Sequence, residues 1–208
     1  EAGTAPGPDY RFGWGLLDVA AGADFLLKEN GKDFQLTEGT LTDGQVIQIP
    51  LTPAAGKRIR ITLAWNDVPG TPVPPALDPV NLMLVNDLDI RLADDKGLVF
   101  QPWILDPGNP AQPATTGDNF RDNVEQIVVD LPSQRPHQLQ LSHKGKLPLA
   151  GQPYSLLITY ERATPAPTFY WVKDSGIWSD TAHWSLASGG ASAHTLPGAQ
   201  DQVIVDEH

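Results

Sequence analysis

The chain of 208 residues contains no cysteine, so it has no disulfide framework, no thiol nucleophile and no cysteine-ligated zinc site. Basic residues are scarce, because 14 lysines and arginines stand against 25 aspartates and glutamates, for a formal net charge of −11. Nucleic acids and anionic membranes attract basic proteins, so neither is an expected partner. No apolar run approaches the roughly 18 residues that cross a bilayer, and no signal peptide is recognisable. Since the first residue is glutamate, we expect a processed chain or a fragment.

Sequence motifs for hydrolytic catalysis are also missing. There is no Gly-x-Ser-x-Gly elbow and no Gly-Thr-Ser-Met-Ala loop. Ser142 and His143 are neighbours, but neighbouring residues on a strand face opposite sides and do not pair easily. The five histidines lack HExxH spacing, and we interpret them as isolated surface residues: His137, His143, His183, His194 and His208. We therefore expect that the chain as it stands is not an enzyme.

Glycine and proline are abundant instead, with 19 and 20 residues spread along the chain without a period. This composition favours many short strands joined by turns over long helices. A hydrophobic content of 40% is enough to build one core in a chain of this length.

The segment from Asn81 to Leu92 carries the clearest strand pattern. From Asp87 onward, three apolar residues alternate with three charged ones: Leu88, Ile90 and Leu92 with Asp87, Asp89 and Arg91. This period of two is typical of a half-buried strand. Two carboxylates at i and i+2 lie about 6 to 7 Å apart on one face, so they need a cation or a base nearby. Arg91 and a bound metal ion are the two alternatives.

Further strands are expected on both sides of this segment. The alternating segments are residues 46–51, 58–65, 98–100, 122–132, 138–143 and 154–160. Asp94–Gly97 predicts a hairpin turn, and long loops are expected at residues 66–79 and 103–121. About eight regularly spaced strands predict an all-β fold, an antiparallel jelly-roll β-sandwich.

One helix is expected, near the start of the chain. After Gly15, apolar residues recur at helical spacing, and Asn30–Gly31 is a stop signal: Leu16, Val19, Ala20, Ala23 and Leu27. Because an isolated helix of about a dozen residues is marginal in water, its apolar face must pack on something. One interpretation is a helix that covers one end of the sandwich.

Several motifs resemble one protein family. Pro8–Asp18, with Tyr10, Trp14 and an alanine-rich continuation, resembles the last helix of the catalytic domain of subtilisin-like serine proteases, the subtilases. Four later motifs resemble the C-terminal β-barrel of a branch of alkaline subtilases, which is similar to the P domain of kexin-like proprotein convertases: Leu63–Asp67, Leu84–Ile90, Asp122–Glu125 and Tyr154–Leu156. The resemblance covers roughly residues 8 to 161. It implies a secreted serine endopeptidase as the parent, whose catalytic motifs lie outside this chain.

The expected domain organisation has four parts. Residues 1–31 would be the terminal helix of a subtilase catalytic domain, and residues 32–162 the jelly-roll sandwich. Residues 163–168 have the composition of a stiff proline-rich linker. Residues 169–208, which contain Trp171, Trp178 and Trp184, resemble the opening of a β module common in large bacterial surface and secreted proteins.

Acidic residues near the expected ends of strands are candidate calcium ligands, because calcium takes six to eight oxygens. The candidates are Asp67, Asp87, Asp89, Asp118, Asp122, Asn123 and Glu125. The subtilase resemblance implies Ca²⁺ as well, since such enzymes usually carry calcium sites. In the alternative, Asp87 and Asp89 pair with Arg91 or Arg121, and Asp122–Asn123 caps a turn.

Two functions from different classes follow. The first is a non-catalytic accessory domain that stabilises the catalytic subtilase domain of the same polypeptide. The second is a module that binds carbohydrate or a cell-surface polymer. For the second, exposed tryptophans at positions 171, 178 and 184 would stack on sugar rings, with core packing of these side chains as the alternative.

Overall fold

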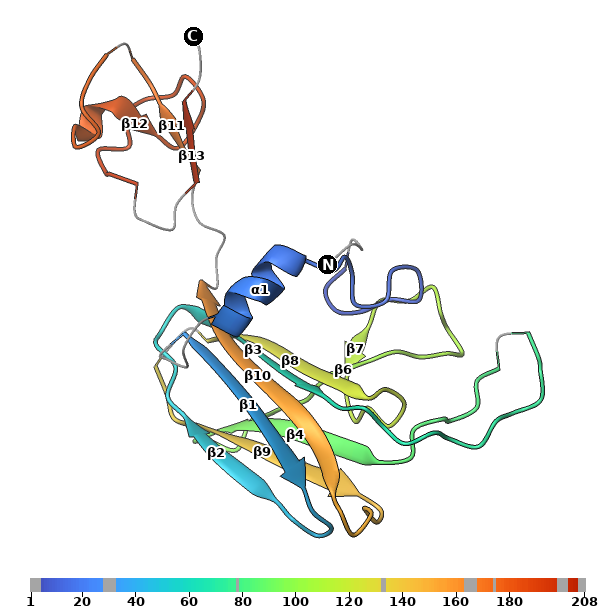
Figure 1. Cartoon of the computed structure of the whole chain (residues 1–208). Coiled ribbons are helices and arrows are strands. Elements are labelled where there is room, and N and C mark those ends of the chain that lie inside the picture. The colour runs from blue at the N-terminus through green and yellow to red at the C-terminus, as the bar shows by residue number, and fades with distance from the viewer. Residues whose placement is uncertain are drawn as a thin grey trace. The chain divides into compact units, whose positions relative to one another are not determined.

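The computed structural model divides into two compact units, residues 1–163 and residues 164–208, and each unit is considered by itself (Figure 1). The structure describes residues 5–27, 33–77, 79–131, 134–162, 168–173, 175–197 and 202–205. None of the helices in these ranges has the length and apolarity needed to span a bilayer.

The large unit is a sandwich of two antiparallel sheets. One sheet has the strand order β1 (Phe34–Leu41), β10 (Gln152–Arg162), β3 (Lys57–Ala64), β8 (Val124–Leu131). The other has the order β2 (Ile47–Leu51), β9 (His137–Lys144), β4 (Asp87–Asp94), β5 (Val99–Phe100). The first strand therefore pairs with the last, and β2 pairs with β9, as the two wrapped Greek keys of a jelly roll require. The predicted jelly-roll sandwich is confirmed.

Period-two alternation builds the core between the sheets. The apolar residues of β3 and β4 point inward and are fully buried, as predicted: Ile59, Ile61, Leu63, Leu88, Ile90 and Leu92. Ile61 lies in register with Ile158 on one side and Ile127 on the other. Trp65, which follows the last residue of β3, is part of the core, and its Nε1 donates to the Asn86 carbonyl oxygen at 2.9 Å.

Turns and loops follow local chemistry. At the β4–β5 hairpin, the Asp94 amide donates to the Leu98 carbonyl, and Gly97 has a φ of +84°, so the turn predicted at Asp94–Gly97 is confirmed. The loop that starts at Asn66 is held at its base by Asp67, whose carboxylate accepts the amides of Val68, Val85 and Asn86.

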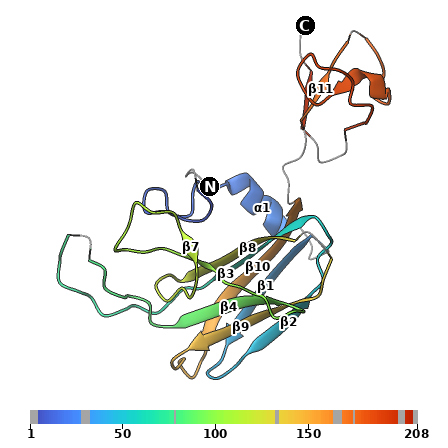
Figure 2. The same cartoon turned by 180° about the vertical axis from the view of Figure 1, so that it is seen from behind.

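The loop that follows β5 contains a small two-stranded sheet, β6 (Trp103–Ile104) and β7 (Thr115–Thr116). The N-terminal segment lies beside this hairpin in both Figure 1 and Figure 2. A close approach of Gly7 to the Trp103 ring places the same two segments in contact.

The helix is shorter and more exposed than expected. Helix α1 runs from Val19 to Leu27, and the Asp18 carboxylate caps it by accepting the Ala21 amide at 2.9 Å. No residue of α1 is buried within this chain, and Phe25 stacks on Phe34 with ring centroids 5.2 Å apart. What covers the rest of the apolar face of α1 stays a prediction. The predicted stop at Asn30–Gly31 lies outside the described residues.

The small unit is a three-stranded sheet ordered β12 (Trp184–Ser185), β11 (Thr168–Trp171), β13 (Gln202–Val205), with a 3₁₀ turn, η1 (Thr181–His183). Trp184 is fully buried, whereas Trp178 is 57% exposed, so core packing holds for the first and not for the second. Of the expected linker at residues 163–168, all but Thr168 fall outside the described ranges.

Replacing Ile61 with alanine tests the central position of β3. Because Ile61 is fully buried between Ile127 and Ile158, we expect Ile61→Ala to lower the free energy of unfolding by about 2 to 5 kcal/mol. Urea unfolding measures this difference. The control Leu149→Ala removes a fully exposed side chain and is expected to change the unfolding free energy by less than about 0.5 kcal/mol. Equal effects of the two substitutions would contradict this core.

Candidate functional site

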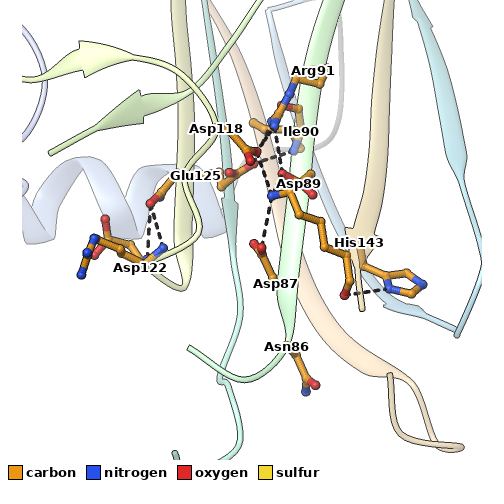
Figure 3. A network of polar contacts seen from close by, with 12 residues as sticks. Asn86, Asp87, Asp89, Ile90, Arg91, Asp118, Asp122, Glu125 and His143 are labelled. Carbon is orange, nitrogen blue, oxygen red and sulfur yellow. Dashed lines mark hydrogen bonds and ion pairs between the residues drawn. The ribbon is translucent and has the colours of Figure 1, made fainter. Parts of the chain in front are cut away.

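A network of charged residues lies at the open edge of the sandwich, where β4 begins and the loop before β8 passes it (Figure 3). Asp87 pairs in register with Lys144 of β9, so their side chains share one face of the sheet. The Lys144 Nζ atom lies 3.1 Å from Asp87 Oδ2, 2.8 Å from Asp89 Oδ1 and 2.8 Å from Asp118 Oδ1. One ammonium group therefore serves three carboxylates.

Arg91 is the second cation of this network. Its Nη2 lies 3.0 Å from Asp89 Oδ1 and also donates to Asp118, while its Nη1 donates to the Ile90 carbonyl oxygen at 2.7 Å. The alternative of pairing by Arg91 is therefore observed for Asp89. Arg121 donates instead to the Val80 carbonyl oxygen. The sequence did not predict the role of Lys144. Lys144 and Asp87 are 57 residues apart in the chain, and only the register between β9 and β4 brings them together.

Glu125 lies behind these residues and is fully buried. Its Oε2 accepts the Ile90 amide at 2.5 Å, and its Oε1 has no hydrogen-bond partner among the described residues. Glu125 belongs to β8 and Ile90 to β4, so this hydrogen bond joins the two sheets. Strand β5 pairs with Leu92 and Ala93 and does not extend to Ile90. The Ile90 amide therefore bonds to the Glu125 carboxyl, and the Ile90 carbonyl oxygen accepts from Arg91.

The electrostatics of the network follow from burial. Burial raises the pKa of Glu125 to about 8, and the neighbouring charge of Asp89 adds to this, against the Ile90 amide, Arg91 and Lys144. Burial also raises the pKa values of Asp87 and Asp89, although Lys144 opposes the change. For Lys144, the hydrogen bonds to the three aspartates outweigh partial burial and raise its pKa.

The other predicted ligands lie elsewhere or have structural partners. Asp67 holds the base of its loop, as described above. The Asn123 side chain donates to the Trp65 carbonyl oxygen at 2.6 Å. The Asp122 amide donates to Asn119 Oδ1 at 3.4 Å, and burial raises the pKa of the Asp122 carboxyl. This arrangement corresponds to the alternative in which Asp122–Asn123 organises a turn.

The side chains present do not fit a calcium ion. Within the described ranges, no group of three or more histidine, aspartate or glutamate side chains is arranged to hold a metal ion. Calcium takes six to eight oxygens, whereas Asp87, Asp89 and Asp118 converge on the Lys144 ammonium group. An ion at this position would have to displace both Lys144 and Arg91. Calcium binding by the protein stays a prediction.

Two histidines interpreted as surface residues are buried, so that interpretation is wrong for them. His137 is 6% exposed, and the His143 side chain is 5% exposed. The His143 Nε2 atom accepts the Gly44 amide at 2.8 Å, and Nδ1 lies 3.3 Å from the Lys144 carbonyl oxygen. His143 is therefore occupied by backbone groups and has no arrangement with Ser142 that would activate a nucleophile.

Comparisons with known proteins identify no family for this chain. No protein-family model matches it, and no curated protein matches it. Among the solved structures that match is PliG of Aeromonas hydrophila, a periplasmic lysozyme inhibitor of g-type lysozyme. The two chains are 14% identical, with a TM-score of 0.35 over 64% of this chain and 93% of that chain. A likeness of this size carries no argument about function.

Replacing Glu125 with glutamine tests the buried carboxyl. Its pKa is raised from 4.5 to about 8 on folding, so between these values the folded chain holds a proton that the unfolded chain has lost. The free energy of unfolding of the wild type therefore falls as the pH rises through this window. Because glutamine does not ionise, Glu125→Gln should gain stability over the wild type progressively from about pH 4.5, by an amount that reaches on the order of a few kcal/mol above about pH 8.

Urea unfolding across this pH range measures the difference. Glu38→Gln, at an exposed carboxylate of β1, is the matched control and should follow the pH dependence of the wild type. Parallel curves for the wild type and Glu125→Gln would show that Glu125 does not retain a proton on folding.

Calcium removal tests the fit of the acidic residues. Because Lys144 and Arg91 already compensate the carboxylates, we expect millimolar calcium to leave the melting temperature of the EDTA-treated chain unchanged within about 1 °C. Differential scanning calorimetry at constant ionic strength, with magnesium as the control cation, measures this. A calcium-specific rise of several degrees would contradict the expectation and restore the predicted calcium site.

Proposed function

We propose that this chain is a non-catalytic accessory region of a secreted, bacterial subtilisin-like serine endopeptidase, in which the jelly roll stabilises the catalytic domain. The subtilase-like motifs support this proposal through what their residues do in the folded sandwich. They contribute to one hydrogen-bonded group at the end of the sandwich where β4 and β8 start and β3 finishes.

The contacts of this group are structural. Trp65 donates to the Asn86 carbonyl oxygen, Asn123 donates to the Trp65 carbonyl oxygen, and the Asn86 side chain donates to Gln152 Oε1 at 2.6 Å. Glu125 adds the bridge to Ile90. These residue types are therefore explained by closure of the sandwich end, without any role in bond cleavage.

The observation that carries the proposal is the exposed apolar surface of the N-terminal segment. Leu16, Leu17, Leu26 and Leu27 are between 77% and 90% exposed. Several large apolar side chains exposed on one short segment favour a contact with another protein domain. The segment is also the one that resembles the last helix of a subtilase catalytic domain, so the catalytic domain of the same polypeptide is the proposed cover.

This contact gives the accessory region a thermodynamic role. A domain that binds the folded state of a neighbour, and not its unfolded state, stabilises that neighbour by mass action. When the two domains belong to one polypeptide, their effective concentration is high and the contact persists. The accessory region then slows unfolding of the enzyme, while the cleavage chemistry belongs entirely to the parent catalytic domain.

Truncation of the parent enzyme tests this function. An enzyme that ends at residue 31 should lose the jelly roll and inactivate at least about tenfold faster on heating, with little change in activity at low temperature. The matched control ends at residue 163 and removes only the small unit. Residual activity on casein after timed heating measures the rates. Equal rates for the two truncations, or casein hydrolysis by the isolated 208-residue chain, would contradict the proposal.

A further inference from the structure

A groove of about 800 Å³ runs over the outer face of the β1-β10-β3-β8 sheet. Because Ile59, Ile61 and Leu63 of β3 point into the core, the residues between them point outward. The floor of the groove therefore consists of side chains from β3 and β8, while its walls come from the N-terminal segment and from β6. The groove volume falls within the range typical of ligand sites.

Two tryptophans form the walls. Trp14 comes from the N-terminal segment and is 41% exposed, and Trp103 comes from β6. Gly7 lies so close to the Trp103 ring that a Cβ atom there would be 2.9 Å from Cδ2, and its φ of +85° also favours glycine. The Trp103 Nε1 atom is buried and has no hydrogen-bond partner among the described residues. Neither tryptophan belongs to the sandwich core.

The floor is polar, and its planar groups are held in place by one another. Arg58 forms two hydrogen bonds to Asp130, at 2.7 and 3.1 Å. Gln126 accepts from Arg60 at 3.3 Å and donates to the Thr62 hydroxyl at 3.0 Å. A guanidinium group has five N–H donors, so Arg60 keeps donors for a ligand besides its hydrogen bond to Gln126 and its ion pair with Glu161, at 3.5 Å from Nε.

We propose that this groove binds a β-linked oligosaccharide with equatorial hydroxyl groups. Such sugar rings have an apolar C–H face, which stacks on an indole, and a rim of hydroxyls, which pair with fixed amide and guanidinium groups. The volume accommodates more than one ring, so an oligosaccharide fits better than a monosaccharide. This inference goes beyond the proposed accessory role and does not depend on it.

The chemistry of the groove disfavours two other classes of ligand. A wholly apolar molecule would displace water from the remaining N–H donors of Arg60 without replacing its hydrogen bonds, which is costly for a polar group. A nucleic acid is disfavoured by the net charge of −11 and by Asp130 in the groove. A proline-rich peptide is a different class of partner that also uses tryptophan-lined grooves, so it enters the test as a competitor.

Calorimetric titration of the full 208-residue chain with cellohexaose, chitohexaose and laminarihexaose tests the proposal. We expect saturable binding of at least one of these oligosaccharides. Trp103→Ala should weaken that binding by at least about tenfold, as the loss of one aromatic stacking contact of about 1.4 kcal/mol would. Gln126→Leu keeps the side-chain volume, removes the amide that links Arg60 and Thr62, and should also weaken binding.

The matched control is Trp178→Ala, which removes an exposed tryptophan of the small unit and should leave binding unchanged. Thermal melting of each variant verifies that the sandwich is folded. Absence of binding to all three sugars by the wild type would overturn the proposal. Loss of binding in Trp178→Ala alone would move the site to the small unit and overturn it too. Binding of a proline-rich peptide that Trp103→Ala abolishes, without sugar binding, would make this a peptide groove.

Discussion

The open edge of strand β4 is closed by one buried hydrogen bond between the two sheets, from the Ile90 amide to the Glu125 carboxyl. On one side Ile90 lies in register with Leu141 of β9, but on the other side it has no strand partner among the described residues, because β5 pairs with Leu92 and Ala93. A free backbone amide in the interior would cost a full desolvation penalty, and an open strand edge would invite association with other chains. Glu125 satisfies the amide and Arg91 satisfies the carbonyl, so two side chains replace the missing strand.

The charged residues Asp87, Asp89 and Asp118 lie at this same edge of β4. Asp89 is buried there, and Lys144 joins it to Asp87 and Asp118. Three carboxylates this close need positive charge, and Lys144 and Arg91 supply it from the neighbouring strand and from β4 itself. Carboxylates paired in this way stabilise the end of the sandwich and leave no ready place for a metal ion.

The two surfaces that we propose for interactions belong to the large unit and differ in chemistry. The exposed leucines of the N-terminal segment are purely apolar and suit a protein domain that covers them. The groove beside Trp14 and Trp103 combines aromatic walls with a fixed polar floor and suits a sugar chain. A domain contact through the leucines and a sugar in the groove would together hold an enzyme on its polysaccharide surroundings. The two proposals stand on separate residues and separate measurements.

The strands were predictable from sequence because alternation is local: the large apolar residues at every second position of 58–65 and 88–92 are buried. The turn at Asp94–Gly97 was predictable for the same reason. Tertiary structure alone decided which residues meet across the chain. Lys144 reaches Asp87 only through strand register, and Glu125 is buried only because β8 crosses the edge of β4. Of the predicted ligands, Asp87, Asp89 and Asp118 meet at Lys144, whereas Asp67 and Asn123 have structural partners of their own. Which side chains converge is set by how the sheets stack, and local patterns carry no information about that stacking.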